Sequence, residues 1–568
     1  MRDSSAHWKE VLLLIVLVVP LIVPPVGCAG DVAPILYRQI AENPEGIFTV
    51  WIAFESRSVL DRDLAALLEV WCRRSLERRA KARKGSLLNQ NDLPVNREGV
   101  KRVTEMGIRV RVHSRWLNAV SAEIPGHRVR SIASLPMVRS VAPVASYHRP
   151  RVEKADPPKR ESDDSMYGPG FGQVDQIQVP VLHSSYGLSG QGVRIALLDT
   201  RFDRDHEALQ HVRVYAEWDF VGGDPTASYE DGDPGGPGAG HGTQTLSTIA
   251  GYRWGQLIGP AYGADYVLAR TEDSSDEQAV EEDYWVAGLE WAESLGVDIL
   301  SSSLGYNAWY SQDDMDGNTA VVTRVADRAA AAGLLVVNSA GNEANNSWGT
   351  IIAPADGDSV LAVGAVYNNG VRVGFSSLGP TADGRIKPDV MAQGASNYVA
   401  SDTDMSGYEY ANGTSFAAPL VAGLAALLLE AHPEWTPGDL MAALRSTATR
   451  AGAPDNHYGW GICQGLGAVQ WTPGAPAMVA PEVRLASPNP FRPGDRVWVA
   501  WENPGEVTVL GVYDCLGRLL ARTRMSPGQE TWIWDATDQD GRAVAPGVYF
   551  VKTMGLNPDP AHKIVLVR

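Results

Sequence analysis

The chain has 568 residues, of which 44% are apolar and 20% are charged, so it can build a hydrophobic core and is neither disordered throughout nor collagen-like. Its four cysteines are scattered without a CxxC pair, which argues against a disulfide scaffold and against a zinc or iron–sulfur cage. The formal net charge of −18 argues against nucleic acid as a partner.

The first predicted element is an apolar run at residues 11–26. It is too short, and too broken by prolines, for a membrane-spanning helix. Small residues follow it, as at a leader-peptidase site, so we interpret residues 1–29 as a secretory signal peptide. Lipidation at Cys28 stays open as an alternative. Either reading predicts a secreted or cell-surface protein.

Residues 30–160 are predicted to form a small α+β unit that ends in a linker. Strand-like and helix-like patterns alternate there, at 47–53, 60–80, 108–112, 129–135 and 137–144. The segment 149–170 is polar and contains prolines, which predicts a linker and a cleavage zone.

Charge is divided unevenly between this unit and the rest of the chain. Residues 31–160 sum to +10 and residues 1–30 to zero, so residues 161–568 carry −28. Opposite charges favour mutual attraction of the two parts, although two unrelated solvated surfaces would give the same count.

Residues 165–472 are predicted to form an α/β domain. Short apolar runs alternate with helical patterns, which is typical of a parallel sheet covered by helices on both faces. The runs lie at 193–198, 265–269, 297–301, 334–338 and 360–366. A proline-rich linker at 473–481 follows, and the short alternating strands of residues 482–568 predict a small all-β sandwich.

Three motifs in the α/β region carry chemistry. Asp199 ends a buried strand, His241 lies between glycines before an apolar helix, and Ser415 opens a long apolar helix. A serine hydroxyl needs a base to become a nucleophile, histidine can take its proton near neutral pH, and an aspartate fixes the histidine tautomer. A helix N-terminus also favours developing negative charge.

In this order the motifs resemble those of the subtilisin-like serine proteases, the S8 peptidase family. The resemblance implies that residues 165–472 form the catalytic domain of a secreted endopeptidase, which cleaves protein or peptide substrates through an acyl-enzyme intermediate. It implies the triad Asp199, His241 and Ser415, and Asn342 in the segment 337–343 as the oxyanion residue. It also implies a substrate-binding strand at Ser303-Leu304-Gly305, chemistry without a cofactor, and structural calcium as an option.

Three positions depart from the family pattern. Arg201 replaces the glycine that usually follows Asp-Thr, so a large cation could narrow the cleft, favour acidic substrate residues or point outward. Gln244 replaces a second histidine of the family pattern. That position is not part of the triad, so we expect no loss of catalytic activity. Ile352 stands near a glycine that often lines the primary specificity pocket, which predicts a shallow pocket for small apolar residues.

The flanking parts carry resemblances of their own. The segments 116–122 and 135–141 resemble inhibitory propeptides, so the chain's own propeptide is a predicted partner, with a permanent accessory domain as the alternative. The segments 487–491, 513–518 and 547–552 resemble immunoglobulin-like C-terminal modules, including type IX secretion sorting domains. A sorting signal read by the secretion machinery, an anchor and an adhesive module all stay open.

Acidic segments raise the question of metals. Asp313, Asp314 and Asp316 could supply carboxylates to calcium, but they do not complete an EF-hand, which favours a surface acidic loop. We interpret the acidic run at 272–282 as a solvated face.

The sequence leaves two functions from different classes. The first is an active secreted endopeptidase, and a peptide ligase or maturation enzyme that acts on one partner is a third reading beside the two. The second is a catalytically inactive binding or adhesion protein that keeps the fold. The presence of all four chemical residues favours the first.

Overall fold

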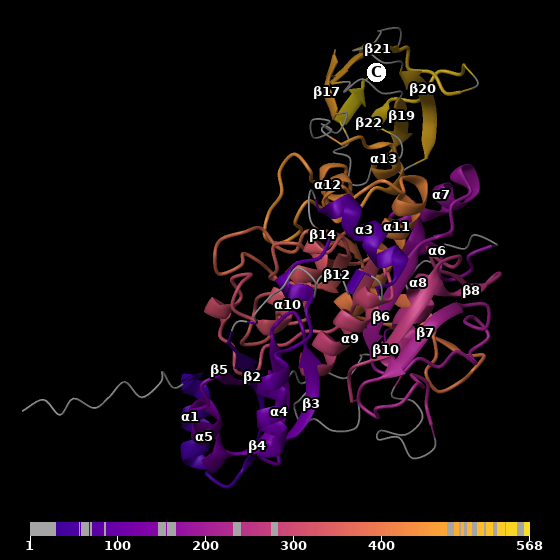
Figure 1. Ribbon diagram of the computed structural model, residues 1–568. Helices are drawn as coiled ribbons and strands as arrows, with labels where there is room; N and C mark the ends of the chain where they lie inside the picture. Colours follow the sequence, from indigo (N-terminus) through magenta and orange to yellow (C-terminus); the bar gives the residue numbers. More distant parts are fainter. Residues whose placement is uncertain are drawn as a thin grey trace, which may run out of the picture.

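The structure is a computed structural model that describes residues 30–55, 57, 67–68, 71–83, 87–145, 155, 166–230, 240–273 and 282–473, and most of 482–567. The predicted signal peptide with Cys28 and most of both linkers lie outside the described residues. Figure 1 shows an N-terminal α+β lobe, a central α/β body and a C-terminal β module.

The N-terminal lobe is built on a five-stranded sheet in the order β1-β5-β2-β4-β3. Apolar side chains from the strands and from the helices that cover them form a separate core, which includes Leu36, Ile52 and Val141. The elements are β1 (Asp31–Val32), α1 (Pro34–Glu42), β2 (Ile47–Phe54), α3 (Arg73–Ala82), α4 (Arg97–Glu105), β3 (Arg109–Ser114), β4 (Ala119–Pro125), α5 (Val129–Ala133) and β5 (Val138–Pro143). Helix α3 stands apart from this core and lies against the central body (Figure 1).

The central body contains a seven-stranded sheet in the order β14-β13-β12-β11-β6-β10-β7, and every pairing in it is parallel. The strands are β6 (Arg194–Asp199), β7 (Arg213–Asp219), β10 (Asp265–Arg270), β11 (Ile299–Ser302), β12 (Leu335–Ser339), β13 (Val360–Val366) and β14 (Val390–Gln393). This arrangement confirms the predicted α/β fold with a parallel sheet.

Helices cover both faces of this sheet because alternate strand residues point to opposite sides. In β6, Ile195 and Leu197 pack with α8 and α11, whereas Ala196 and Leu198 pack with α9 and α10. The helices of the body are α6 (Phe171–Asp175), α7 (Val179–Tyr186), α8 (His241–Ala250), α9 (Glu282–Ser294), α10 (Val321–Ala331), α11 (Thr414–Ala431), α12 (Pro437–Ser446) and α13 (Gly465–Gln470). Two small hairpins complete it, β8 (Tyr252–Arg253) with β9 (Leu257–Ile258) and β15 (Asn397–Ala400) with β16 (Tyr408–Ala411).

Helix α11 is the central core helix of the body. Among the described residues it alone is long and apolar enough to cross a membrane by composition, but 83% of it is buried inside the protein. Its apolar residues on all sides therefore serve internal packing against the sheet.

The C-terminal module is all β, as predicted. One sheet pairs β17 (Glu482–Ser487), β18 (Val497–Glu502) and β21 (Thr531–Trp534). The other has the order β20 (Leu519–Met525), β19 (Thr508–Asp514), β22 (Gly547–Thr553) and β23 (His562–Leu566). Phe491, Trp534 and Tyr549 pack edge to face in the core that the two sheets share.

Candidate active site

Three neighbouring strands deliver candidate site residues to one edge of the central sheet. Asp199 is the last residue of β6, the segment 303–305 follows β11, and the segment 340–342 follows β12. These strands are adjacent and parallel, so their carboxyl ends lie side by side, where open α/β sheets commonly bind ligands. The topology therefore brings together residues that are more than a hundred positions apart in the sequence.

Asp199 and His241 form a buried, oriented pair. His241 Nδ1 lies 2.7 Å from Asp199 Oδ1, and the two residues are 6% and 1% exposed. The aspartate is held in turn by the Thr200 backbone N–H at 2.8 Å and by the Thr245 hydroxyl at 3.1 Å. A histidine that donates Nδ1–H to a fixed carboxylate presents Nε2 as the base.

Ser415 lies at the start of α11, beside the histidine. It is the second residue of the helix, and the ring of the next residue, Phe416, is 5.7 Å from the His241 ring between centroids. The Ser303 hydroxyl donates to the Ser415 carbonyl at 2.8 Å, which ties the helix start to the segment after β11. Ser415 keeps 7% of its surface exposed. All three triad candidates thus meet at one site.

The Asn342 carboxamide is oriented by Thr414. Its oxygen accepts from the Thr414 backbone N–H at 3.0 Å and from the Thr414 hydroxyl at 2.9 Å. The amide nitrogen is therefore left to face the other way. A Cβ placed on Gly413 would lie 3.6 Å from Ser415 N and 3.7 Å from Asn342 Nδ2, so the two nitrogens border one small space. Two donors around a space beside the nucleophile form an arrangement suited to an oxyanion.

Ile352 fills the space between the two segments that border the nucleophile. A Cβ on Gly305 would lie only 2.1 Å from Ile352 Cδ1, and a Cβ on Gly341 would lie 3.1 Å from Ile352 Cγ1. The isoleucine is 2% exposed. Its side chain therefore lies against both segments.

The other two departures from the family pattern lie beside the site. Arg201 is 3% exposed, and its guanidinium carbon lies 5.0 Å above the Tyr229 ring, so it does not point outward into solvent. Gln244 donates to Glu409 at 2.7 Å, which links α8 to the hairpin β15–β16. Neither side chain interrupts the pairing of Asp199 and His241.

The N-terminal lobe docks on α9 through carboxylates that the sequence analysis missed. Glu290 accepts from Ser114 Oγ at 2.6 Å and from the Trp116 N–H at 3.2 Å, and Asp283 accepts from Ser121 Oγ at 2.6 Å. Both carboxylates are buried. The acidic spacing along 283–293 was the available signal, but it is equally typical of a solvated helix face.

The end of the lobe lies on Glu282. The Ala145 N–H donates to Glu282 at 2.6 Å, and Trp309 Nε1 donates to the Val144 carbonyl at 3.1 Å. Glu282 has no exposed surface and Glu272 is only 6% exposed, so the predicted solvated face is wrong at both ends of the run, while residues 274–281 lie outside the described residues. Burial raises the pKa of Glu282 to about 7, against the Ala145 and Tyr310 hydrogen bonds that favour its charged form.

The acidic loop considered for calcium is held by its own turns. Asp314 accepts from the Ser311 N–H and hydroxyl, and Asp316 accepts from the Asn318 and Thr319 N–H groups. Within the described residues no three acidic, histidine or cysteine side chains form a group that could hold a metal ion. Calcium binding stays an untested prediction.

Comparison with known proteins agrees with this geometry. A family model described as the subtilase family matches residues 190–461, and one described as the peptidase S8 propeptide domain of Bacteroidota matches residues 49–160. Subtilisin NAT of Bacillus subtilis subsp. natto is 33% identical over 371 residues, covering 65% of this chain and 85% of that protein. Subtilisin of Bacillus pumilus is 36% identical over 300 residues, covering 52% of this chain and 98% of that protein.

A solved structure matches nearly the whole chain. Fervidolysin from Fervidobacterium pennivorans, a keratinolytic enzyme related to subtilisin, aligns with a TM-score of 0.57 at 18% identity. The alignment covers 94% of this chain and 89% of that one, and at this identity it shows the fold alone. The sequence relatives carry the further conclusion: the chain belongs to the subtilase family and is a serine endopeptidase with its own propeptide domain.

Proposed function

We propose that Asp199, His241 and Ser415 are the catalytic triad of this endopeptidase and that Asn342 is its oxyanion donor. The observation that carries the assignment is the 2.7 Å contact of Asp199 with His241 beside the helix that Ser415 opens. His241 Nε2 removes the Ser415 proton as Oγ attacks the scissile carbonyl, and Asp199 stabilises the imidazolium.

The remaining steps follow from the same groups. The carbonyl oxygen takes up negative charge, and Asn342 Nδ2 with the Ser415 N–H donates to it. The imidazolium gives its proton to the leaving amine, which leaves an acyl group on Ser415. Water then repeats the sequence with His241 as base, and the acid product leaves Ser415 free.

A fluorophosphonate probe tests this assignment, because it labels only an activated serine. We expect labelling of the processed wild-type enzyme at Ser415, located by peptide mass mapping, and loss of labelling in His241→Ala. An unlabelled but folded and processed protein would instead support the inactive binding or adhesion protein.

We further propose that Ile352 restricts the primary specificity pocket to small apolar side chains. Its contacts with Gly305 and Gly341 support this, since both glycines lie on segments that border the nucleophile. In Ile352→Ala, kcat/KM for a phenylalanine peptide should rise roughly tenfold or more relative to an alanine peptide, since each methylene in an apolar pocket discriminates by about 1–3 kcal/mol.

The matched control is Ile351→Ala, a neighbouring buried isoleucine that packs with Ala340, Ala355 and Ala362. Ile351→Ala removes a similar volume from the core, so it is matched to Ile352→Ala in its cost in stability. Its ratio of kcat/KM for the two peptides should nevertheless stay within about twofold of the wild-type ratio. If both variants change the ratio equally, Ile352 is only a packing residue.

We propose that residues 30–145 inhibit the enzyme until they are released, after a cut in the linker. Burial of Glu282, on which the end of the lobe lies through Ala145, makes release depend on pH. The docked pKa of Glu282, about 7, lies above the ordinary 4.5, so docking favours the protonated carboxyl. The stabilisation that protonated Glu282 gives to docking is complete below the ordinary pKa of 4.5 and is lost as the pH rises through the docked pKa of about 7. Burial raises the pKa of Asp283 and Glu290 too, in the same direction.

The fraction of cleaved propeptide that co-elutes with the enzyme should therefore fall between pH 4.5 and pH 7. The dissociation constant should rise by up to about tenfold per pH unit in that window. Glu282→Gln, which cannot ionise, should flatten the profile measured by size exclusion. An identical slope in the glutamine variant would exclude Glu282 as the group responsible.

We also propose that the enzyme acts outside the cell and that its C-terminal sandwich is read by the secretion machinery. The apolar leader and the module's resemblance support this. Deleting residues 474–568 should leave activity on a short peptide intact while the protein fails to reach the medium. Normal export of the truncated chain would assign the module another role.

A further inference from the structure

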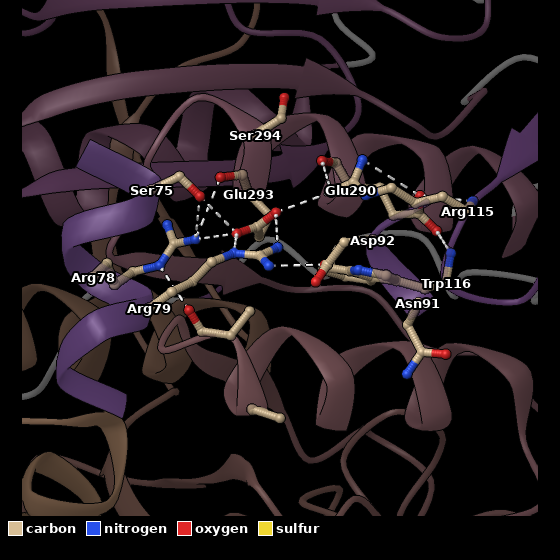
Figure 2. Close-up of polar contacts among 12 residues, drawn as sticks. Ser75, Arg78, Arg79, Asn91, Asp92, Arg115, Trp116, Glu290, Glu293 and Ser294 are labelled. Carbon is tan, nitrogen blue, oxygen red and sulfur yellow. Dashed lines mark hydrogen bonds and ion pairs between the residues drawn. The ribbon is translucent and has the colours of Figure 1, made fainter. Parts of the chain in front are cut away.

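Glu293 of α9 is enclosed by arginines of the N-terminal lobe. Arg79 binds it with two parallel hydrogen bonds, Nε to Oε1 at 3.0 Å and Nη2 to Oε2 at 2.9 Å. Arg78 pairs with Oε1, and Arg115 Nη2 donates to Oε2 at 2.9 Å (Figure 2). Arg79 and Glu293 have no exposed surface. A two-bond guanidinium–carboxylate contact of this kind is specific in geometry as well as charge.

The charge balance of this cluster is close to complete. Arg79 also pairs with Asp92 at 2.8 Å, and Ser75 Oγ donates to Glu293 at 2.8 Å. Burial alone would raise the pKa of Glu293, but the charges of Arg78, Arg79 and Arg115 and the Arg79 hydrogen bond hold it at about 2. Glu293 is therefore ionised and paired whenever α3 is docked.

Arginines of α3, and Arg83 directly after it, donate to backbone carbonyls where α9 and α10 end. Arg74 Nε donates to Gly296 O at 3.0 Å, Arg78 Nε to Ala332 O at 3.2 Å, and Arg83 Nε to Ala331 O at 3.0 Å. Carbonyls at a helix C-terminus lack partners within the helix and carry partial negative charge. Arg78 Nη2 also donates to the Glu293 carbonyl in the last turn of α9 at 3.3 Å, so arginines of α3 and Arg83, which follows it directly, bind carbonyls at the ends of two helices of the catalytic domain.

The glycines that follow α9 and α10 leave room for α3 to pack closely. Gly296 and Gly333 follow α9 and α10 with φ of +76° and +89°. A Cβ on Gly296 would lie 2.8 Å from Arg74 Cβ, and one on Gly333 would lie 2.9 Å from the Arg78 carbonyl. Any other residue at either position would hold α3 away from the carbonyls, so the surface is shaped as well as charged for this helix.

We propose that Glu293 and the carbonyl ends of α9 and α10 form a guanidinium-selective docking site, separate from the active site, that retains the propeptide through α3 after the linker is cut. This rests on the proposed role of residues 30–145 as a releasable inhibitor. The site takes arginine rather than lysine because its acceptors are a two-oxygen carboxylate and several separate carbonyls. One planar guanidinium can reach two of these acceptors at once, whereas an ammonium is a single point of charge.

Full-length chains with matched substitutions test the proposal. Arg78→Lys with Arg79→Lys keeps the charge but loses the two-bond contact, and Glu293→Gln changes the enzyme side. Arg73→Lys is the control, since its side chain is 91% exposed and, among the described residues, pairs within α3 with Glu77. Each chain is allowed to process, the linker cut is followed on gels, and propeptide release is timed by the appearance of activity on a short peptide after dilution.

We expect release about thirtyfold faster or more in the double lysine and Glu293→Gln variants, and within twofold of wild type in the control. Free arginine should displace more propeptide from the wild-type complex than lysine at equal ionic strength. Normal cutting with equal release in all four chains, or equal displacement by the two amino acids, overturns the docking site.

A separate arm distinguishes this failure from failure of the proposed function. If wild-type linker is never cut, the inhibitor role fails, and hydrogen exchange in the intact chains still tests the docking site. The double lysine variant should then lose protection in α9 residues 290–294 relative to Arg73→Lys. Equal protection in the two chains would again overturn the site.

Discussion

Replacing Ser415 with alanine is expected to reduce hydrolysis of a peptide substrate by at least about ten-thousandfold, because the attacking oxygen is lost while the oxyanion donors stay in place. The change removes one oxygen at the second residue of α11 and leaves the helix start and its Ser303 contact intact. The protein should therefore fold and accumulate as an uncut precursor if processing is self-catalysed. Activity assays and N-terminal sequencing of the purified product measure both effects.

Ser406→Ala provides the control, since Ser406 is an exposed serine whose hydroxyl bonds to Asp404, two residues before it, within the part of the chain that the structure describes. It should process and cleave like wild type. Residual casein cleavage by pure Ser415→Ala would refute the triad, whereas normal processing without activity would show that another protease makes the cut.

Replacing Asn342 with alanine is expected to lower kcat by roughly a hundredfold or more with little change in KM. That magnitude is known for an oxyanion asparagine in this family and is not calculated from the present geometry. The physical reason is that Nδ2 donates to the oxygen only as charge develops in the transition state. Steady-state kinetics on one peptide substrate separates kcat from KM.

Asn345→Ala, at an exposed position three residues on, should leave both constants unchanged. Loss of the Thr414 contacts in Asn342→Ala also loosens the start of α11, so the melting temperature is recorded alongside. A raised KM with unchanged kcat would make Asn342 a residue of ground-state binding.

The grouping of Asp199, His241 and Ser415 at one site could be predicted from the sequence because each residue lies in a recognisable local pattern. Taken alone, an aspartate after a buried strand is typical of a turn and a serine before an apolar helix is typical of a cap, so the order of Asp199, His241 and Ser415 carried the prediction. Edge strand β7 could not be predicted, since its residues are charged and aromatic as well as aliphatic and only Asp219 of its seven residues is buried. Strand β14 has only four residues, too few for a periodic pattern.

The burial of the arginines could not be predicted from the sequence for a different reason. Arg78 and Arg79 lie in a basic stretch that, taken alone, resembles any solvated helix face. Their burial is tolerable only because Glu293 lies opposite, more than two hundred residues later in the chain. No local pattern contains that pairing, and the same holds for Glu282 and the end of the lobe.

The docking of the lobe on α9 and α10 has a consequence for how the sheet assembles. These helices are the crossovers from β10 to β11 and from β11 to β12, and β11 must insert beside β6, pairing Ile299 with Ile195. Pairing two parallel strands that are distant in sequence closes a long loop, and the entropy of that closure is lost before stabilising contacts form. Such sheets are therefore slow to fold. The N-terminal lobe has its own core and packs on both crossover helices, so it can hold α9 and α10 in place before the sheet is complete. A chain stripped of residues 30–145 has to search for that arrangement unaided, so once unfolded it should regain activity far more slowly than the precursor.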